Sequence, residues 1–241
     1  MTINYCWLGR GEKPEKVKYC IESWKRICPD AEIKEWNEDN FDLNSNLYIK
    51  KAYAEKKYAF VSDYMRFFIL YKYGGVYLDT DVELIKDVTP LLKESFMGFE
   101  GDDRVNSGLI MNASGGEPFL KEVLDYYDSL KEEEIDFENV TVVTIVTDLL
   151  KEYGLKTDNS MQFIAGFKIY PTEYFNPKGG DYGKEKITEN TYSIHHYAAS
   201  WKSSLDQKIM RYKVKYGVKK GKFIFTLRHP FLAIKKFREK K

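Results

Sequence analysis

Short apolar runs alternate with segments of helical periodicity along the first two hundred residues of the chain. Thr2–Trp7 is a short β-prone run, and Ala31–Trp36 holds Ile33 within a polar frame, which predicts two strands. Between them, Val17 and Ile21 stand at helical spacing behind Pro14, a residue suited to the first turn of a helix. Strands that alternate with helices in this way predict an α/β fold, with a mostly parallel, doubly wound sheet flanked by helices.

The same periodicities place the later elements. Asn37–Asn46 is rich in Asn and Asp and is expected to be a loop, while the apolar stripe of 58–73 predicts a helix that Gly74 and Gly75 terminate. Further strands are predicted at 76–78, 95–99, 109–112, 168–170 and 192–197, and further helical segments at 90–94, 118–130, 144–153 and 208–216.

The sharpest local signal is the segment GGVYLDTDVEL at 74–84, in which an apolar strand leads to Asp79 and Asp81. Residues two apart in an extended segment project to the same side. Two carboxylates suit Mg²⁺ or Mn²⁺, which bind through one or two carboxylates plus substrate phosphates. Ligands also bind at the carboxyl ends of strands in open α/β sheets. The alternative is a solvated turn.

A second pair lies on the preceding helix, where Asp63 and Arg66 are three residues apart and share a face. One interpretation is an ordinary ion pair within the helix. The other is that both side chains point into the pocket that Asp79 and Asp81 line, which spacing alone does not decide.

Four blocks of sequence resemble the family 32 glycosyltransferases. AFVSDYMRFFILYKYGGVYLDTD, at 59–81, is similar to the D-x-D region of these enzymes, which include bacterial capsular-polysaccharide sugar transferases and fungal initiating mannosyltransferases. NYCWLG at 4–9, CIESWKRICPDAEIKEWNEDNFD at 20–42 and YSIHHYAASW at 192–201 resemble further family segments in the same order. A more distant similarity is to the glucosylating domain of large clostridial toxins. The resemblance implies a GT-A fold, a nucleotide-sugar donor with a UDP-sugar favoured, Mn²⁺ or Mg²⁺, and retention of anomeric configuration.

The resemblance also implies a metal site. Asp81 is expected to bind the metal directly, and Asp79 to hold the donor and reach the metal through water. His196 corresponds to a third metal ligand, since a neutral imidazole serves Mn²⁺ well. The residues alone would instead make His195 and His196 a strand pair with one side chain buried.

The remaining expected roles concern the donor. Asp63 and Arg66 are expected to contact the donor sugar or its phosphates, and Trp7 to stack on the nucleobase. Trp201 is expected to close over the diphosphate with help from Ser200. For Trp7 the alternative is an ordinary buried tryptophan at a strand end.

Asn106 opens the segment NSGLIMN and resembles an asparagine that faces the donor sugar in related retaining enzymes. A turn before a strand is the equally open alternative, because Asn and Gly favour turns.

The expected reaction is departure of a nucleoside diphosphate with front-face attack by the acceptor, because no residue is an unambiguous nucleophile for a double displacement. A haloacid-dehalogenase-like phosphatase is an alternative, since YLDTDV superficially matches the D-x-D strand end of that class. A non-catalytic nucleotide-sugar-binding module is the third option, and the intact pair of aspartates with Arg66 argues against it.

Charge divides the 241 residues into two parts. Residues 206–241 hold 13 Lys/Arg and 2 Asp/Glu, a net charge of +11, whereas residues 1–205 hold 25 Lys/Arg and 35 Asp/Glu. This predicts a GT-A catalytic domain at 1–205 and a basic amphipathic tail at 206–241. A charge asymmetry of this kind indicates a polyanionic partner for the tail.

In the tail, Phe231, Ile234 and Phe237 fall on one side of a predicted helix whose other side is basic. Binding to the anionic inner leaflet is the favoured interpretation, packing on the acidic body is the alternative, and nucleic acid is not expected as a partner. The chain is therefore expected to be cytoplasmic and peripheral on the inner face of the cell membrane. Its expected acceptor is a growing surface glycan such as capsular polysaccharide, with a lipid-linked form as one option.

Overall fold

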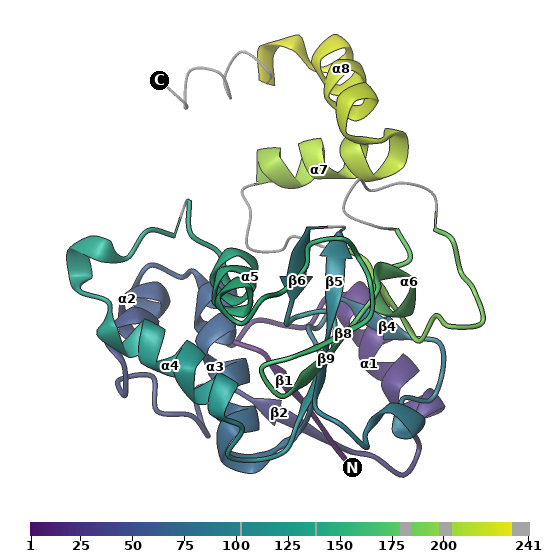
Figure 1. Ribbon diagram of the computed structural model, residues 1–241. Coiled ribbons are helices and arrows are strands. Elements are labelled where there is room, and N and C mark those ends of the chain that lie inside the picture. Colours follow the sequence, from purple (N-terminus) through teal and green to yellow (C-terminus); the bar gives the residue numbers. More distant parts are fainter. Residues whose placement is uncertain (102, 138, 179–184, 198–203, 233–241) are drawn as a thin grey trace.

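The computed structural model describes residues 1–101, 103–137, 139–178, 185–197 and 204–232. Helices flank a central sheet, and two further helices lie beyond one end of it (Figure 1). The helices are α1 (Glu15–Ile27), α2 (Leu47–Ala54), α3 (Tyr58–Tyr73), α4 (Pro118–Ser129), α5 (Val142–Glu152), α6 (Thr172–Phe175), α7 (Ser204–Tyr216) and α8 (Val218–Arg228), with 3-10 turns at Thr89–Leu91 and Glu132–Glu134. The strands are β1 (Thr2–Cys6), β2 (Glu32–Trp36), β3 (Gly75–Tyr77), β4 (Val82–Leu84), β5 (Phe96–Gly101), β6 (Arg104–Asn106), β7 (Met111–Ala113), β8 (Gln162–Ile164), β9 (Phe167–Tyr170) and β10 (Ser193–His195).

The central sheet has eight strands in the order β2-β1-β3-β7-β5-β9-β8, with β6 paired to β5 outside this path. Strand β1 runs parallel to β2 and β3, and β5 runs parallel to β9, while β7 is antiparallel to both β3 and β5. Five strands, β1, β2, β3, β5 and β9, therefore point the same way. The expected α/β class, with a mostly parallel sheet between helices, is confirmed, and β6, β7 and β8 make the sheet mixed.

The sheet separates two cores, because alternate residues of each strand face opposite sides. Val76 and Phe96 belong to the core beneath α1 and α6, whereas their neighbours Tyr77 and Met97 belong to the core beneath α2, α3, α4 and α5. Helices on both faces of the sheet leave the ends of its strands as the place where a site can form.

Helix α3 has the bounds that its apolar stripe predicts and ends at Gly74, whose φ of 68° lies in the left-handed region. Gly75 has a φ of 98°, and a Cβ atom there would lie 2.8 Å from the carbonyl oxygen of Thr2. The two glycines thus end α3 and allow the backbone at the start of β3 to pack closely against β1.

Several elements differ from the sequence prediction. Pro14 precedes α1 as its N-cap instead of forming its first residue. Helix α2 was not predicted, although the Asn46 side chain caps it by accepting hydrogen bonds from the backbone N–H groups of Tyr48 and Ile49. The unpredicted strands β4, β6 and β8 have three residues each, too few for a periodic pattern. The predicted tail helix beyond residue 232 lies outside the described residues, and the division of the chain at 205 stays a prediction.

Candidate active site

The buried guanidinium of Arg66 forms ion pairs with one carboxylate of α3 and one of the D-x-D segment. Arg66 is 2% exposed, and its Nη2 lies 2.8 Å from Oδ1 of Asp63 and 3.0 Å from Oδ1 of Asp79. Its Nη1 donates to Oγ of Ser107 at 3.4 Å, and the guanidinium lies 5.0 Å from the centre of the Tyr77 ring. Of the two interpretations left open for Asp63 and Arg66, the ion pair is present, and it extends to the D-x-D segment.

Asp79 is where this network reaches solvent. Its side chain is 26% exposed, against 12% for Asp63 and 3% for Arg66. Oδ1 of Asp79 also accepts a hydrogen bond from the Tyr77 hydroxyl at 3.1 Å. Two donors on one oxygen fix the orientation of this carboxylate while part of it stays open to a ligand.

Gly108, in the turn after β6, packs against this network. Its carbonyl oxygen accepts from the backbone N–H of Asp79 at 3.1 Å. A Cβ atom on Gly108 would lie 2.0 Å from Oδ2 of Asp79 and 2.7 Å from Nη1 of Arg66. The turn after β6 can approach the Asp79–Arg66 pair this closely because residue 108 has no side chain.

Asp81 contacts β10 through the side chain of His195. Nε2 of His195 lies 3.1 Å from Oδ1 of Asp81, and the backbone N–H of His196 donates to the Asp81 carbonyl at 3.0 Å. The imidazole of His196, the expected metal ligand, points instead to Oε2 of Glu83 at 2.8 Å. The two imidazoles diverge because the antiparallel pairing of β10 with β4 sets His195 opposite Val82 and turns consecutive side chains to opposite sides.

Asp81 and His195 are a carboxylate and an imidazole on adjacent chain segments, a donor set that suits Mn²⁺ or Mg²⁺ when phosphate oxygens complete the coordination. Nδ1 of His195 is buried and has no hydrogen-bond partner. Among the described residues, no three or more His, Cys, Asp or Glu side chains are grouped to hold an ion by themselves. The pair therefore fits a cation that is shared with a bound diphosphate.

Trp7 follows β1 and is partly buried at the edge of the core beneath α1. Its indole N–H donates to the carbonyl oxygen of Gly11 at 2.8 Å, and Nζ of Lys13 lies 5.7 Å from the ring centre. Ser200 and Trp201 lie outside the described residues.

Asn106 ends β6 with both polar atoms of its amide engaged. Oδ1 accepts from the backbone N–H of Gly108 at 2.7 Å, and Nδ2 donates to Oε1 of Glu100 at 3.2 Å. These contacts are those of the turn interpretation, and the role of Asn106 beside the donor sugar stays a prediction. Asn106 thereby shapes the turn that brings Gly108 to Asp79.

Three residues that the sequence did not mark as site residues, Glu100, Asn176 and Tyr197, connect the end of β5 to the segment that follows β10. The side-chain amide of Asn176 donates to the carbonyl oxygen of Glu100 at 2.6 Å and to the hydroxyl of Tyr197 at 2.5 Å. The Tyr197 ring lies 4.2 Å from that of His195, centre to centre. Tyr197 stands inside the closing segment of the resemblance, but only the folded chain shows its contact with Asn176.

Burial dominates the ionisation of the network. It raises the pKa of Asp63 to about 7, against the opposing charge of Arg66, and it also raises the pKa of Asp79. Burial acts to lower the pKa of His195, but the charge and hydrogen bond of Asp81 outweigh it, so this pKa is raised. Two buried carboxylates thus share one guanidinium, which favours a proton on one of them.

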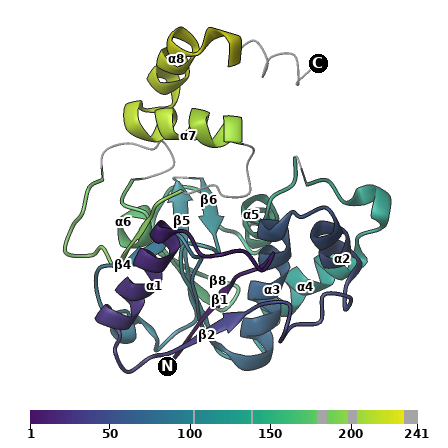
Figure 2. The same ribbon diagram turned by 180° about the vertical axis from the view of Figure 1, so that it is seen from behind.

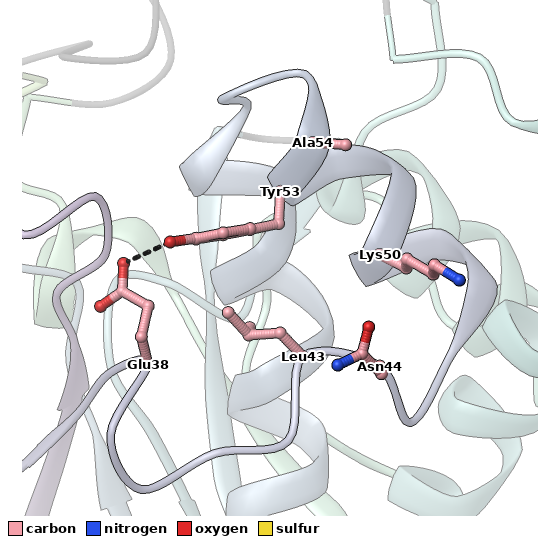
Figure 3. Close-up of a pocket in the computed structure, with 6 residues that line it drawn as sticks. All are labelled: Glu38, Leu43, Asn44, Lys50, Tyr53 and Ala54. Atoms are coloured by element: carbon pink, nitrogen blue, oxygen red, sulfur yellow. Dashed lines mark hydrogen bonds between the residues drawn. The ribbon is translucent and has the colours of Figure 1, made fainter.

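A separate pocket of about 410 Å³ lies between the 37–46 loop and α2 (Figure 3). Its lining side chains come from both segments, and the Tyr53 hydroxyl donates to Oε1 of Glu38 at 3.1 Å. The lining residues are Glu38, Leu43, Asn44, Lys50, Tyr53 and Ala54. None of them is a predicted site residue, so this pocket is distinct from the Arg66 network.

Residues 14–97 match the family described as "Glycosyltransferase sugar-binding region containing DXD motif". The match contains Asp63, Arg66, Asp79 and Asp81. It confirms the resemblance to D-x-D glycosyltransferases over these residues.

Two curated relatives come from Schizosaccharomyces pombe. "Inositol phosphoceramide mannosyltransferase 3" is 32% identical over 126 residues, which is 51% of this chain and 35% of the relative. "Inositol phosphoceramide mannosyltransferase 1" is 30% identical over 94 residues, 39% of this chain and 26% of the relative. The chain thus spans about a third or less of the length of these relatives.

Two solved structures also resemble the chain. "PaToxG Glycosyltransferase" is 20% identical with a TM-score of 0.49, covering 63% of this chain and 68% of that one. A glycosyltransferase involved in glycosylation of the major capsid of PBCV-1 is 11% identical with a TM-score of 0.43, covering 86% and 97%.

The substitution Gly108→Ala is expected to destabilise the protein, because its methyl group would overlap the Asp79 carboxylate. Overpacking of this kind lowers the unfolding free energy by about 1–3 kcal/mol. Gly115→Ala is the matched control, since its Cβ would make an ordinary contact of 3.6 Å with the Tyr71 carbonyl oxygen. Urea unfolding measures both, and equal stability of the two variants would contradict the close approach of Gly108.

A pH dependence follows from the raised pKa of Asp63. Between about pH 4, where an unfolded aspartate titrates, and about pH 7, the folded state holds a proton that the unfolded state has lost. The unfolding free energy should therefore fall as pH rises through this window. Asp63→Asn should remove this part of the fall, whereas the exposed Asp30→Asn should not. Identical pH slopes for the wild type and Asp63→Asn in urea unfolding would exclude a protonated Asp63.

Proposed function

We propose that this chain is a metal-dependent, retaining glycosyltransferase that moves a hexose from a nucleotide-sugar donor, with a UDP-sugar favoured, to a glycan acceptor. The observation that carries the proposal is the D-x-D segment after β3, with Asp79 held by the buried Arg66 and Asp81 beside His195. The match of residues 14–97 to a glycosyltransferase sugar-binding region supports the same activity.

In this proposal Asp79 accepts hydrogen bonds from hydroxyl groups of the donor sugar or ribose. Its partial exposure supports direct contact, and the donors from Arg66 and Tyr77 hold it ready. The burial of Arg66 and Asp63 supports a positioning role, in place of the direct donor contact that their resemblance to the family implies. A preset carboxylate binds its ligand without the cost of ordering the side chain on binding. We keep Trp7, Ser200 and Trp201 as proposed donor contacts.

Asp81 and His195 are the residues that would hold Mn²⁺ or Mg²⁺, with His196 as the alternative imidazole. When bound, the cation supplies positive charge to the leaving diphosphate. Holding the ion next to Asp79 would keep the sugar and the diphosphate in one orientation.

Retention is proposed to proceed by front-face attack. The acceptor oxygen bonds to the anomeric carbon as the bond from that carbon to the diphosphate oxygen breaks, and the acceptor proton passes to the leaving phosphate. The ion pairs of Asp63 and Asp79 with Arg66 support this route, because a carboxylate that shares its charge with a guanidinium is a weaker nucleophile. A glycosyl adduct trapped on Asp63, Asp79 or Glu100 would replace it with a double displacement.

For the acceptor we propose a growing cell-surface glycan such as capsular polysaccharide, carried on a lipid. The names of the two curated relatives, which refer to inositol phosphoceramide, support a lipid-borne acceptor. Their mannosyltransferase names also keep GDP-mannose among the candidate donors. A phosphatase of the haloacid-dehalogenase type has less support, because Asp79 and Asp81 follow the third strand and lie inside the matched glycosyltransferase region.

The substitutions Asp81→Ala and His195→Ala should each lower nucleoside diphosphate release with Mn²⁺ by roughly 100-fold or more, because each removes a proposed ligand of the cation. His196→Ala is the matched control and should stay within a few-fold of the wild type. Release is measured across a panel of nucleotide sugars, with thermal melting as the check on folding. Unchanged turnover in Asp81→Ala would exclude a cation held by Asp81. Loss of turnover in His196→Ala but not in His195→Ala would assign the ligand role to His196.

A further inference from the structure

Helices α7 and α8 form a packed hairpin around Tyr212. The Tyr212 ring lies 5.5 Å from that of Phe225, and its hydroxyl is 3.1 Å from Nε2 of His229. Gly221 allows the helices to cross closely, since a Cβ atom there would lie 2.4 Å from the carbonyl oxygen of Tyr212. Gly217, with a φ of 81°, makes the turn between the helices. The inner face of α8 is therefore the one that holds Gly221 and Phe225.

The outer face of α8 is apolar and exposed. Phe223 and Leu227 stand two residues to either side of Phe225, which turns them roughly 160–200° away from the α7 contact. Phe223 is 65% exposed, Leu227 66% and Phe231, just beyond the helix, 85%. Exposed large apolar side chains gathered on one surface mark an interaction site more often than scattered ones do.

Cations surround this stripe. Lys219, Lys220, Lys222 and Arg228 are all exposed on α8. They belong to the segment 206–241 with its net charge of +11, and the remainder of the chain is acidic. The exposure of Phe223, Leu227 and Phe231 argues against packing of this face on the described part of the acidic body.

We propose that the outer face of α8, defined as Phe223, Leu227 and Phe231 together with the exposed flanking cations Lys219, Lys220, Lys222 and Arg228, docks on an anionic lipid bilayer. The apolar side chains enter the boundary between headgroups and acyl chains, and the cations face lipid phosphates. No helix in the described ranges is long and apolar enough to cross a bilayer. Nucleic acid would pair with the cations but would leave the phenylalanine stripe without a partner.

The position of the hairpin suits this role. Figures 1 and 2 show α7 between the sheet and α8, at the end of the molecule opposite the N terminus, where β1 begins. The carboxyl ends of the parallel strands, with Asp79 and Asp81, therefore face the same end as the hairpin. Docking would hold the candidate active site on the bilayer side, where a lipid-borne acceptor is found.

Vesicle flotation of the full chain tests this surface without relying on catalysis. Wild type should float at least tenfold more with vesicles that contain roughly one-third phosphatidylglycerol than with pure phosphatidylcholine, and high salt should weaken the binding. The triple variant Phe223→Ser, Leu227→Ser and Phe231→Ser should lose about tenfold or more of it. A second triple variant, Lys219→Gln, Lys220→Gln and Lys222→Gln, should lose a similar amount. Phe163→Ser is the matched control, because Phe163 is 63% exposed on β8, and it should bind as wild type does.

Three results would overturn the proposal. The first is wild-type flotation that is absent or equal on neutral and anionic vesicles. The second is a folded apolar triple variant, verified by thermal melting, that floats as wild type does. The third is that the apolar triple variant loses a different interaction while its vesicle binding persists. That interaction would be self-association, seen as concentration-dependent sedimentation, or RNA binding. Nucleotide-sugar turnover on a water-soluble acceptor should be equal in wild type and both triple variants, so this test is independent of the proposed function.

Discussion

The buried guanidinium of Arg66 is the constraint on which the candidate site depends. A charged side chain that is only 2% exposed is tolerated on α3 only if carboxylates and hydrogen-bond acceptors surround it. Asp63 comes from the same helix and Asp79 from the end of β3, so the ion pairs tie α3 to the D-x-D segment. Removing either carboxylate would leave part of this buried charge uncompensated.

The same constraint explains features that otherwise look unrelated. The turn after β6 must come close enough for its backbone to bond to Asp79, which requires a glycine at 108. Asn106 shapes that turn, and Ser107 adds an acceptor for Arg66. These contacts hold the D-x-D segment in one conformation. Its second aspartate, Asp81, contacts His195 of β10.

Prediction from the sequence succeeded where the signal is local. The aromatic stripe and paired glycines were sufficient for α3, and the β-prone runs for β1 and β2, because each depends on neighbouring residues. The strands β4, β6 and β8 are too short to have a period, and the cap on α2 required recognition of Asn46. These elements are stabilised by partners distant in the sequence.

The site divides in the same way. Asp63, Arg66, Asp79 and Asp81 are visible as residues of the right chemistry, but their convergence depends on how α3 packs against β3. Which of His195 and His196 faces Asp81 depends on the register of β10 with β4. A register one residue different would exchange the two side chains, and the amino-acid composition would be the same. Glu100 and Asn176 carry no motif of their own and enter only through tertiary contacts.

The acidic and basic parts of the chain correspond to different parts of the structure. The acidic part of the chain includes the carboxylates of the candidate site, and the basic part forms a hairpin whose inner face is satisfied by Tyr212 and Phe225. The outer face of α8 keeps both its cations and its apolar side chains available. An electrostatic difference between two ends of one chain can in this way orient the whole molecule at a charged surface.

The central claim is that Arg66 presents Asp79 and Asp81 as a nucleotide-sugar site. It is tested most directly by calorimetric titration of the full chain with UDP-hexoses and GDP-mannose in the presence of Mn²⁺. At least one donor should bind to wild type and to the exposed control Asp148→Asn, and binding to Asp79→Asn should weaken by about tenfold or more, since a hydrogen bond to a charged group is lost. Equal binding to a folded Asp79→Asn variant, or no donor binding to wild type, would contradict the claim.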